Sequence, residues 1–502
     1  MDELLLTRAR VAGASADGAR VTRPHGEPVD VHVRDGRVVA VGAGLGATVR
    51  PAVERVDLEG RVVIPGLWDA HVHLAQWALA RRRLDVSDAV SAASAAQQVT
   101  TRLSAGFDGE VLVGYGFRDG QWPDTPDARQ LDAAAVRAGR PGTPVVILAS
   151  DLHSAWLNTA ALSRFGVEGH TDGVVREADW LGAGEIVNLT PEPLLDSLVD
   201  EATAAAAARG VVGIVDFDTA DNLTAWRRRI AAGATGLRVE ASMWPGHLDR
   251  VVKEELHSGD VILGSEGLLT MGSLKVIVDG SLTNRSAYCF DPYPGLDGAH
   301  ARGVLSLGLD ELTVLMAHAH RKGLRCAVHA IGDAAIAIAL DAFEASGARG
   351  SVEHAELVDT DDVHRFAALG IVASVQPEQA MDDRDIAEAA WAGRTDRAFP
   401  LGSLAAAGVR LAFGSDAPVT PLDPWAAVSA AVTRSRDGRE PWHPEQRLDL
   451  ETALGASVRS QVAPGHVADL AVLDADPWAA ADLRGMPVAG ALLGGRWTWR
   501  AW

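Results

Sequence analysis

The stretch Val62-Val63-Ile64-Pro65-Gly66-Leu67-Trp68-Asp69-Ala70-His71-Val72-His73-Leu74 decides the predicted fold. It is a continuous apolar run that ends in two histidines. Runs of this kind are typical of parallel strands that are covered on both faces. Because side chains two residues apart on a strand share a face, His71 and His73 are expected to point the same way. Paired imidazoles are good ligands for a divalent transition metal; two polar core histidines are the alternative.

Seven further apolar runs follow the first, and alanine-rich stretches with helical periodicity separate most of them. The eight runs cover residues 62–74, 211–217, 237–243, 274–280, 324–331, 350–356, 371–377 and 409–416. Strands that alternate with helices in this number predict an α/β fold, a (β/α)₈ TIM-like barrel.

The remaining sequence divides into two parts. Alternating apolar residues at 29–33 and 38–42, and apolar runs at 468–473 and 488–493, predict strands near both chain ends. We therefore predict a small β-sandwich domain formed by residues 1–64 and 457–502, and a barrel over residues 65–456. Residues 76–208 do not follow the alternation of strands and helices that the barrel requires. We interpret them as an insertion after the first barrel strand, folded over the active face.

Other polar residues lie near the ends of later runs: His329, His354 and Asp416. The carboxyl ends of barrel strands meet at one face, where the active sites of such barrels lie. Buried charges without partners would be costly there. Four histidines and an aspartate that converge on one rim therefore predict a bound cation.

Composition excludes several other classes. The net charge is −21, from 67 acidic and 46 basic residues, and no Lys/Arg cluster suggests a nucleic-acid partner. Cys289 and Cys326 lie in no CxxC pattern, which disfavours a thiolate zinc site and a disulfide scaffold. No segment has the pattern of a membrane span or secretory signal, and we expect a cytoplasmic protein without a membrane partner. The sequence does not indicate an oligomeric state, and a homodimer is expected only because dimers are the commonest oligomers.

The chain resembles the amidohydrolase superfamily, within it the long-insert group similar to N-substituted formamide deformylases (amidohydrolase family 3). The markers are residues 65–73, 275–287 and 414–418 together with the His329 and His354 segments. The resemblance implies that Lys275 is carboxylated and bridges two metal ions. His71, His73 and Asp416 would then hold one ion, and His329 and His354 the other. The alternative for Lys275 is an ion pair with a carboxylate such as Asp279. One or two divalent ions are expected, with Zn²⁺ favoured over manganese, iron or cobalt.

The expected function is hydrolysis of a non-peptide C–N bond, in an amide, N-formyl or N-acyl amine, by metal-activated hydroxide. Asp416 would move the proton from water to the leaving nitrogen. His153 in the insertion is a candidate catalytic donor that reaches the substrate, and Trp122 and Arg285 are candidate substrate contacts. Arg285 paired with an acid, and Trp122 as packing, are the alternatives. The alternative reactions at the same site are cyclic amide opening, deamination and lactone hydrolysis. A metal-free, non-catalytic scaffold is a further alternative.

Overall fold

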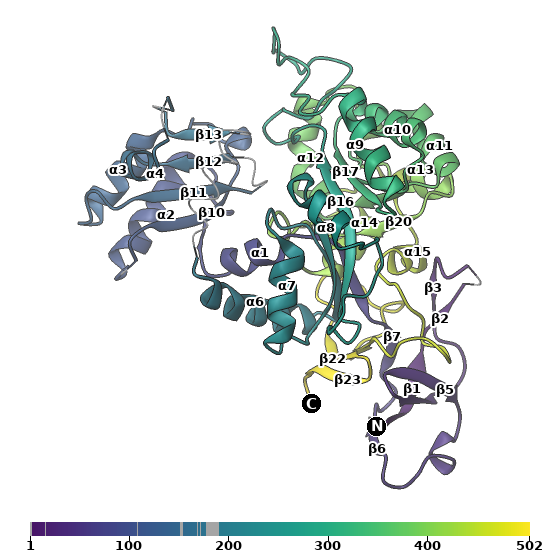
Figure 1. The fold of residues 1–502 in the computed structure, drawn as a ribbon. Helices are drawn as coiled ribbons and strands as arrows, with labels where there is room; N and C mark the ends of the chain where they lie inside the picture. The colour runs from purple at the N-terminus through teal and green to yellow at the C-terminus, as the bar shows by residue number, and fades with distance from the viewer. Residues whose placement is uncertain are drawn as a thin grey trace.

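The structure is a computed structural model, which describes residues 3–15, 17–107, 109–150, 154–167, 169–170, 172–176 and 190–502. Three sheets organise this part of the chain: a barrel, a mixed sheet built from the chain ends, and a smaller sheet in the insertion. Figure 1 shows the insertion beside the barrel, and both termini near the chain-end sheet. Within these residues, no helix is both long enough and apolar enough to cross a bilayer.

Eight parallel strands form the barrel, in sequence order around it. They are β8 (Leu67–Val72), β14 (Val211–Asp216), β15 (Arg238–Met243), β16 (Leu269–Ile277), β17 (Cys326–Ala330), β18 (Gly350–His354), β19 (Val372–Val375) and β20 (Leu411–Phe413). The first and last strands meet where Val72, the last residue of β8, pairs in parallel with Ala417, which follows β20. The predicted barrel is confirmed.

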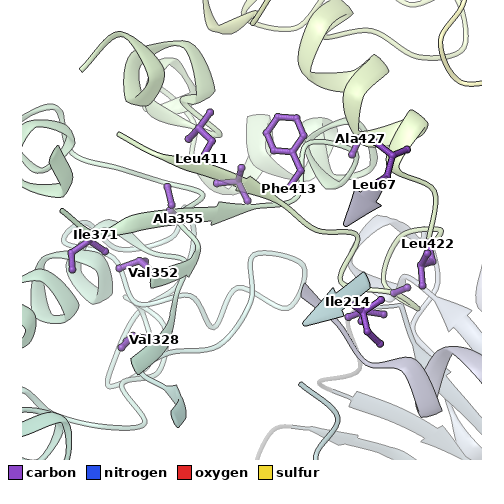
Figure 2. Close-up of a cluster of buried hydrophobic side chains, with 14 of the residues drawn as sticks. Leu67, Ile214, Val328, Val352, Ala355, Ile371, Leu411, Phe413, Leu422 and Ala427 are labelled. Carbon is purple, nitrogen blue, oxygen red and sulfur yellow. The ribbon is translucent and has the colours of Figure 1, made fainter. Parts of the chain in front are cut away.

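Helices follow most of the barrel strands and cover the outside (Figure 1). They are α1 (Leu74–Ala80), α6 (Glu192–Ala207), α7 (Asn222–Ala231), α8 (Leu248–Lys253), α9 (Leu309–Arg321), α10 (Asp333–Ser346), α11 (Thr360–Leu369), α12 (Gln379–Ala390), α13 (Leu401–Ala406), α14 (Pro424–Thr433) and α15 (Leu450–Gly455). Apolar side chains of the strands pack against all of these helices except α12 in one large buried cluster, part of which Figure 2 shows around Val352, Phe413 and Ala427. Removing this surface from water is the main force that holds the barrel together.

Strands from both chain ends join, as predicted, in one mixed sheet, in the order β23-β22-β21-β7-β1-β4-β5, with β6 beside β1. The strands are β1 (Glu3–Val11), β4 (Val29–Arg34), β5 (Arg37–Gly42), β6 (Glu54–Asp57), β7 (Val62–Pro65), β21 (Leu470–Leu473), β22 (Val488–Leu493) and β23 (Arg496–Arg500). A two-stranded ribbon of β2 (Gly13–Ala14) and β3 (Val21–Thr22) lies apart from it.

The first apolar run is two strands rather than one, which corrects the sequence analysis. Strand β7 ends at Pro65 in the chain-end sheet, whereas β8 begins at Leu67 in the barrel. Gly66 joins them and donates its N–H to the carbonyl of Asp469. A Cβ at Gly66 would lie 2.5 Å from Cγ1 of Val212, so the side chain of Val212 leaves no room for a larger residue.

The insertion has its own sheet and its own buried cluster, which contains Trp156 and Leu131. Its strands, in the order β13-β12-β11-β10-β9, are β9 (Leu84–Asp85), β10 (Leu112–Phe117), β11 (Val145–Ala149), β12 (Ser154–Leu157) and β13 (Val174–Arg176). Helices α2 (Ala92–Ser104), α3 (Ala128–Arg137) and α4 (Thr159–Phe165) accompany the sheet. Because it carries a separate core, this unit packs as a body of its own.

The insertion contacts the barrel at the rim where strands end. The hydroxyl of Tyr115 donates to the carbonyl of Pro418, which follows β20. Arg118 forms an ion pair with Asp382 of α12, with an N–O distance of 3.2 Å. These contacts place Tyr115 of β10, and Arg118 directly after that strand, beside the face on which the predicted site residues lie.

Candidate metal centre

His71, His73 and Asp416 form the centre of the site. His71 and His73 come from the end of β8, and Asp416 follows β20. Oδ1 of Asp416 lies 3.5 Å from Nε2 of His71 and 3.2 Å from Nε2 of His73. Among the described residues, this is the one group of three or more metal-ligating side chains whose ligand atoms all lie within 4.8 Å of one another.

The spacing of these atoms fits a metal ion. Ligands that sit about 2.05 Å from a tetrahedral zinc ion lie about 3.3 Å from one another. The two distances to Oδ1 of Asp416, 3.5 and 3.2 Å, agree with that value. Two imidazole nitrogens and a carboxylate oxygen are also the donor chemistry that zinc and related divalent ions accept.

His329 and His354 lie beside this group. His354 ends β18, and its Nδ1 lies 4.0 Å from Oδ2 of Asp416. The rings of His329 and His354 are in contact, with centroids 4.4 Å apart. Nε2 of His329 lies 3.1 Å from the carbonyl oxygen of Gly280 and 3.6 Å from Oδ1 of Asp279. The structure therefore brings all four predicted histidines and Asp416 together.

Lys275 lies among these residues, and the start of its strand corrects the sequence analysis. The apolar run appeared to begin at Leu274, but β16 begins at Leu269. Thr270, Gly272 and Ser273 interrupt the apolar pattern and hide the first half of the strand. Lys275 is consequently near the carboxyl end of β16, with Nζ 3.4 Å from Nε2 of His71.

Burial determines the charge state of the lysine. Desolvation lowers the pKa of Lys275 to about 8, while the charges of Glu353 and Asp416 oppose that change. The amine lies over the ring of Phe217, 4.5 Å from the centroid. Asp279, the partner considered for Lys275, accepts the backbone N–H groups of Ile331, Gly332 and Tyr288.

The electrostatics of the central group favour the ligating forms of His71 and Asp416. Burial, followed by the charge of Lys275, lowers the pKa of His71 well below its ordinary value, so the imidazole is neutral. Burial alone would lower the pKa of His73, but its contact with Asp416 outweighs burial and raises it. Burial raises the pKa of Asp416, yet His71, His73 and Lys275 together lower it, so the carboxylate is ionised at neutral pH.

The backbone at the site is strained. His354, Ala355 and Asp416 have φ values of 75°, 45° and 56°, in the left-handed region that residues other than glycine rarely adopt. The N–H of Asp416 donates to the carbonyl of His71 at 2.7 Å, which helps to hold it there. Such strain is concentrated at functional sites, where the surrounding structure fixes it.

Glu353 is a site residue that the sequence analysis missed. Its Oε2 accepts a hydrogen bond from Nδ1 of His71 at 2.7 Å, and Ser351 donates to its other oxygen. With Nδ1 occupied in this way, Nε2 of His71 is left to face the metal position. The available signal was an acidic residue between Val352 and His354, in the buried half of the strand.

Replacing Glu353 with glutamine is expected to weaken divalent metal binding about 10- to 100-fold. The amide accepts the His71 proton less strongly than a carboxylate, so the ring is less well oriented and less basic. Competition with a chromogenic chelator measures the affinity. Glu344→Gln, on the exposed face of α10, is the control and should bind as the wild type does. Equal affinity of Glu353→Gln and wild type would contradict the orienting role.

Three predicted residues lie elsewhere or outside the described part of the chain. His153 falls outside the described residues. Trp122 contacts Phe117 and Trp156 in the insertion, and its indole N–H donates to the carbonyl of Ala89, so the structure places it in packing contacts. Arg285 follows β16 on an exposed turn with a φ of 60°. Their roles toward a substrate stay predictions.

Comparisons with known proteins agree with this geometry. The chain is 28% identical to the putative amidohydrolase YtcJ of Bacillus subtilis, covering 89% of this chain and 91% of that one. It is 25% identical to N-substituted formamide deformylase of Arthrobacter pascens, over 89% and 90% of the two chains. It is 28% identical to Protein LONG AFTER FAR-RED 3 of Arabidopsis thaliana, over 89% and 84%.

A solved structure shares the fold. An uncharacterized metal-dependent hydrolase from Pyrococcus horikoshii superimposes with a TM-score of 0.78 at 24% identity, covering 95% of this chain and 98% of that one. The model of the amidohydrolase family matches residues 54–485, which include every residue of the site described above. This chain belongs to the amidohydrolase family.

Proposed function

We propose that this hydrolase cleaves a non-peptide carbon–nitrogen bond, in an amide, N-formyl or N-acyl amine, with a zinc ion as its principal cofactor. The observation that carries the proposal is the ligand spacing of His71, His73 and Asp416. The deformylase from Arthrobacter pascens, which the chain matches over 90% of its length, is named for action on N-substituted formamides. Its name supports the choice of bond.

His71, His73 and Asp416 would hold one ion, and His329 and His354 a second one if Lys275 is carboxylated. A divalent cation held there lowers the pKa of water toward neutrality and polarises a substrate carbonyl. The remaining chemistry belongs to side chains of the protein. Water adds to the carbonyl carbon, and the C–N bond then breaks to give a carboxylic acid and an amine.

Asp416 is the group proposed to move the proton. Because its carboxylate is ionised at neutral pH and 7% exposed, it can accept a proton from the attacking water in a nearly dry environment. The same oxygen can then deliver that proton to the departing nitrogen. The strained backbone of Asp416 keeps the carboxylate pointed at the site while the proton is transferred.

Metal removal is the direct test. Protein purified without chelator is analysed by elemental mass spectrometry and assayed on a panel of N-formyl, N-acyl, cyclic amide and lactone substrates. We expect bound zinc, and turnover of the open-chain amides that falls at least about a hundredfold on chelation and returns when zinc is added.

Two outcomes would overturn the proposal. Turnover confined to lactones or cyclic amides would assign the same site to a different reaction. Protein that binds no metal even after incubation with zinc and bicarbonate would instead point to a non-catalytic scaffold. The variant His71→Ala separates specific from adventitious zinc, because only specific binding should fall in it.

A further inference from the structure

His73 is held at the metal centre in a different way from His71. Nδ1 of His71 is hydrogen-bonded to the carboxylate of Glu353, the kind of partner that orients most metal-ligating histidines. Within the described part of the chain, the one hydrogen-bonding partner of the His73 ring is Asp416, which is itself a predicted ligand. The direction of the His73 ring therefore depends on how its own main chain is held.

The main chain of His73 is the junction between a strand and a helix. Strand β8 ends at Val72 and helix α1 begins at Leu74, and His73 between them has a φ of −109° and a ψ of 82°. The N–H of His73 donates to the carbonyl of Ala417 at 2.9 Å, and its carbonyl accepts the N–H of Trp77 at 2.8 Å. The side chain of His73 does not cap the helix, so the first N–H groups of α1 need another acceptor.

Asp218 supplies that acceptor from the neighbouring strand. It lies two residues beyond the end of β14 and is 4% exposed. Its Oδ2 accepts the N–H of Ala75 at 2.6 Å, and its Oδ1 accepts the N–H of Gln76 at 3.3 Å. A carboxylate at the start of a helix satisfies such donors and also interacts favourably with the helix dipole. Both oxygens of Asp218 are thus bonded to the first turn of α1.

Asp218 is itself fixed by buried hydrogen bonds. Its N–H donates to Oδ1 of Asp216 at 3.0 Å, and the indole N–H of Trp226 donates to Oδ2 of Asp216 at 2.6 Å. The carbonyl of Asp218 accepts hydrogen bonds from the side chains of Asn222 and Trp244, both at 2.8 Å. Asp218 therefore connects the first turn of α1 to β14 and to the start of α7.

The residue before Asp218 holds the other side of His73. The N–H of Phe217 donates to the carbonyl of Val72 at 2.8 Å. Residues 217 and 218 consequently bond the chain directly before His73, and again two and three residues after it. Because His73 stands between these hydrogen bonds, a shift of the first turn of α1 would turn its ring.

We propose that Asp218 is a positioning residue for the metal centre, which acts on the ion through His73. By fixing the first turn of α1, its carboxylate fixes the main chain of His73 and so the direction in which Nε2 of His73 points beside Asp416. The inference rests on the metal site of the proposed function and adds to it a residue outside the group of ligands. Loss of the Asp218 carboxylate releases the turn, and the imidazole is then less often in the ligating direction.

The zinc affinity of the full-length protein tests the inference without requiring turnover. In competition with a chromogenic chelator, Asp218→Ala should bind zinc about 10- to 100-fold more weakly than wild type, the range found when a residue that supports a metal ligand is removed. Asp218→Asn should be about three- to tenfold weaker than wild type, because its amide oxygen still accepts one N–H while its NH₂ group cannot accept the second. Asp218→Asn carries the test if Asp218→Ala does not fold.

Asp449→Ala is the matched control, because it removes an acidic cap from another short helix of the barrel. Asp449 precedes α15, and its Oδ1 accepts the N–H of Thr452 at 2.8 Å. Thermal unfolding should show that Asp449→Ala and Asp218→Ala are both less stable than wild type. The zinc affinity should fall only in Asp218→Ala and stay within about threefold of wild type in Asp449→Ala.

The outcomes separate positioning of His73 from a general loss of stability. Zinc affinity unchanged in both Asp218 variants would overturn the inference, as would equal losses in Asp218→Ala and Asp449→Ala, which reduced stability alone would explain. Wild type that binds no zinc would overturn it together with the metal site. If zinc binds with the expected dependence on Asp218 but no amide is cleaved, the proposed reaction fails while the inference stands.

Discussion

Replacing Asp416 with asparagine is expected to lower kcat/KM for amide hydrolysis at least about a thousandfold. The amide has the size of the carboxylate, so the contacts with His71 and His73 keep their geometry. It cannot accept a proton from water or return one to the leaving nitrogen. It also removes the one anionic ligand among the three residues of the central group. Steady-state kinetics on the best substrate from the amide panel measure the loss.

Two controls distinguish a loss of catalysis in Asp416→Asn from a loss of folding. Asp310→Asn, at the exposed start of α9, makes the same chemical change far from the site and should retain wild-type kinetics. Thermal unfolding of Asp416→Asn should stay close to that of wild type, because asparagine tolerates the left-handed backbone at this position better than most residues. An Asp416→Asn variant that keeps more than about a tenth of the activity would exclude the proton-transfer role.

The parts of this molecule that sequence could predict are those with a local signature. His71 and His73 share a face because strand geometry places residues two apart on the same side. Val328 and Val352 belong to runs that are apolar because their strands are covered on both faces (Figure 2). The position of these runs in the chain predicts the barrel, and the barrel brings their carboxyl ends to one rim.

The parts that sequence could not predict depend on contacts between distant residues. Glu353 and His71 are 282 positions apart, and nothing near either residue predicts their hydrogen bond. Strand β1, the partner of β4, β6 and β7, was missed because its bulge between Leu6 and Ala9 breaks the alternating pattern.

Replacing Lys275 is the second change with a large expected effect, because its carboxylation would supply the bridge between two metal positions. With a pKa of about 8, about half of the amine is neutral at pH 8, and only the neutral form is nucleophilic. Nζ then attacks the carbon of carbon dioxide, an N–C bond forms, and one proton leaves to solvent. The resulting carbamate carries two oxygens in place of a cation that cannot ligate.

We expect wild type incubated with zinc and bicarbonate at pH 8 to bind two equivalents of zinc, and Lys275→Ala to bind one at most. Lowering the pH to about 6 during loading should also reduce occupancy, because the amine becomes protonated below its pKa. Lys322→Ala, at the exposed end of α9, is the control and should bind two equivalents. Carbon-13 bicarbonate would label the carbamate for detection by NMR.

The cavity left in Lys275→Ala offers a sharper test of mechanism than loss of function alone. A short carboxylic acid such as propionate can occupy the vacated space and present two oxygens where the carbamate would stand. Its addition should restore the second equivalent of zinc and part of the activity in Lys275→Ala, and should change neither in wild type. Two equivalents retained by Lys275→Ala without propionate would show that the bridge is not made by this lysine. The second ion would then depend on His329, His354 and Asp416, whose side chains already adjoin one another.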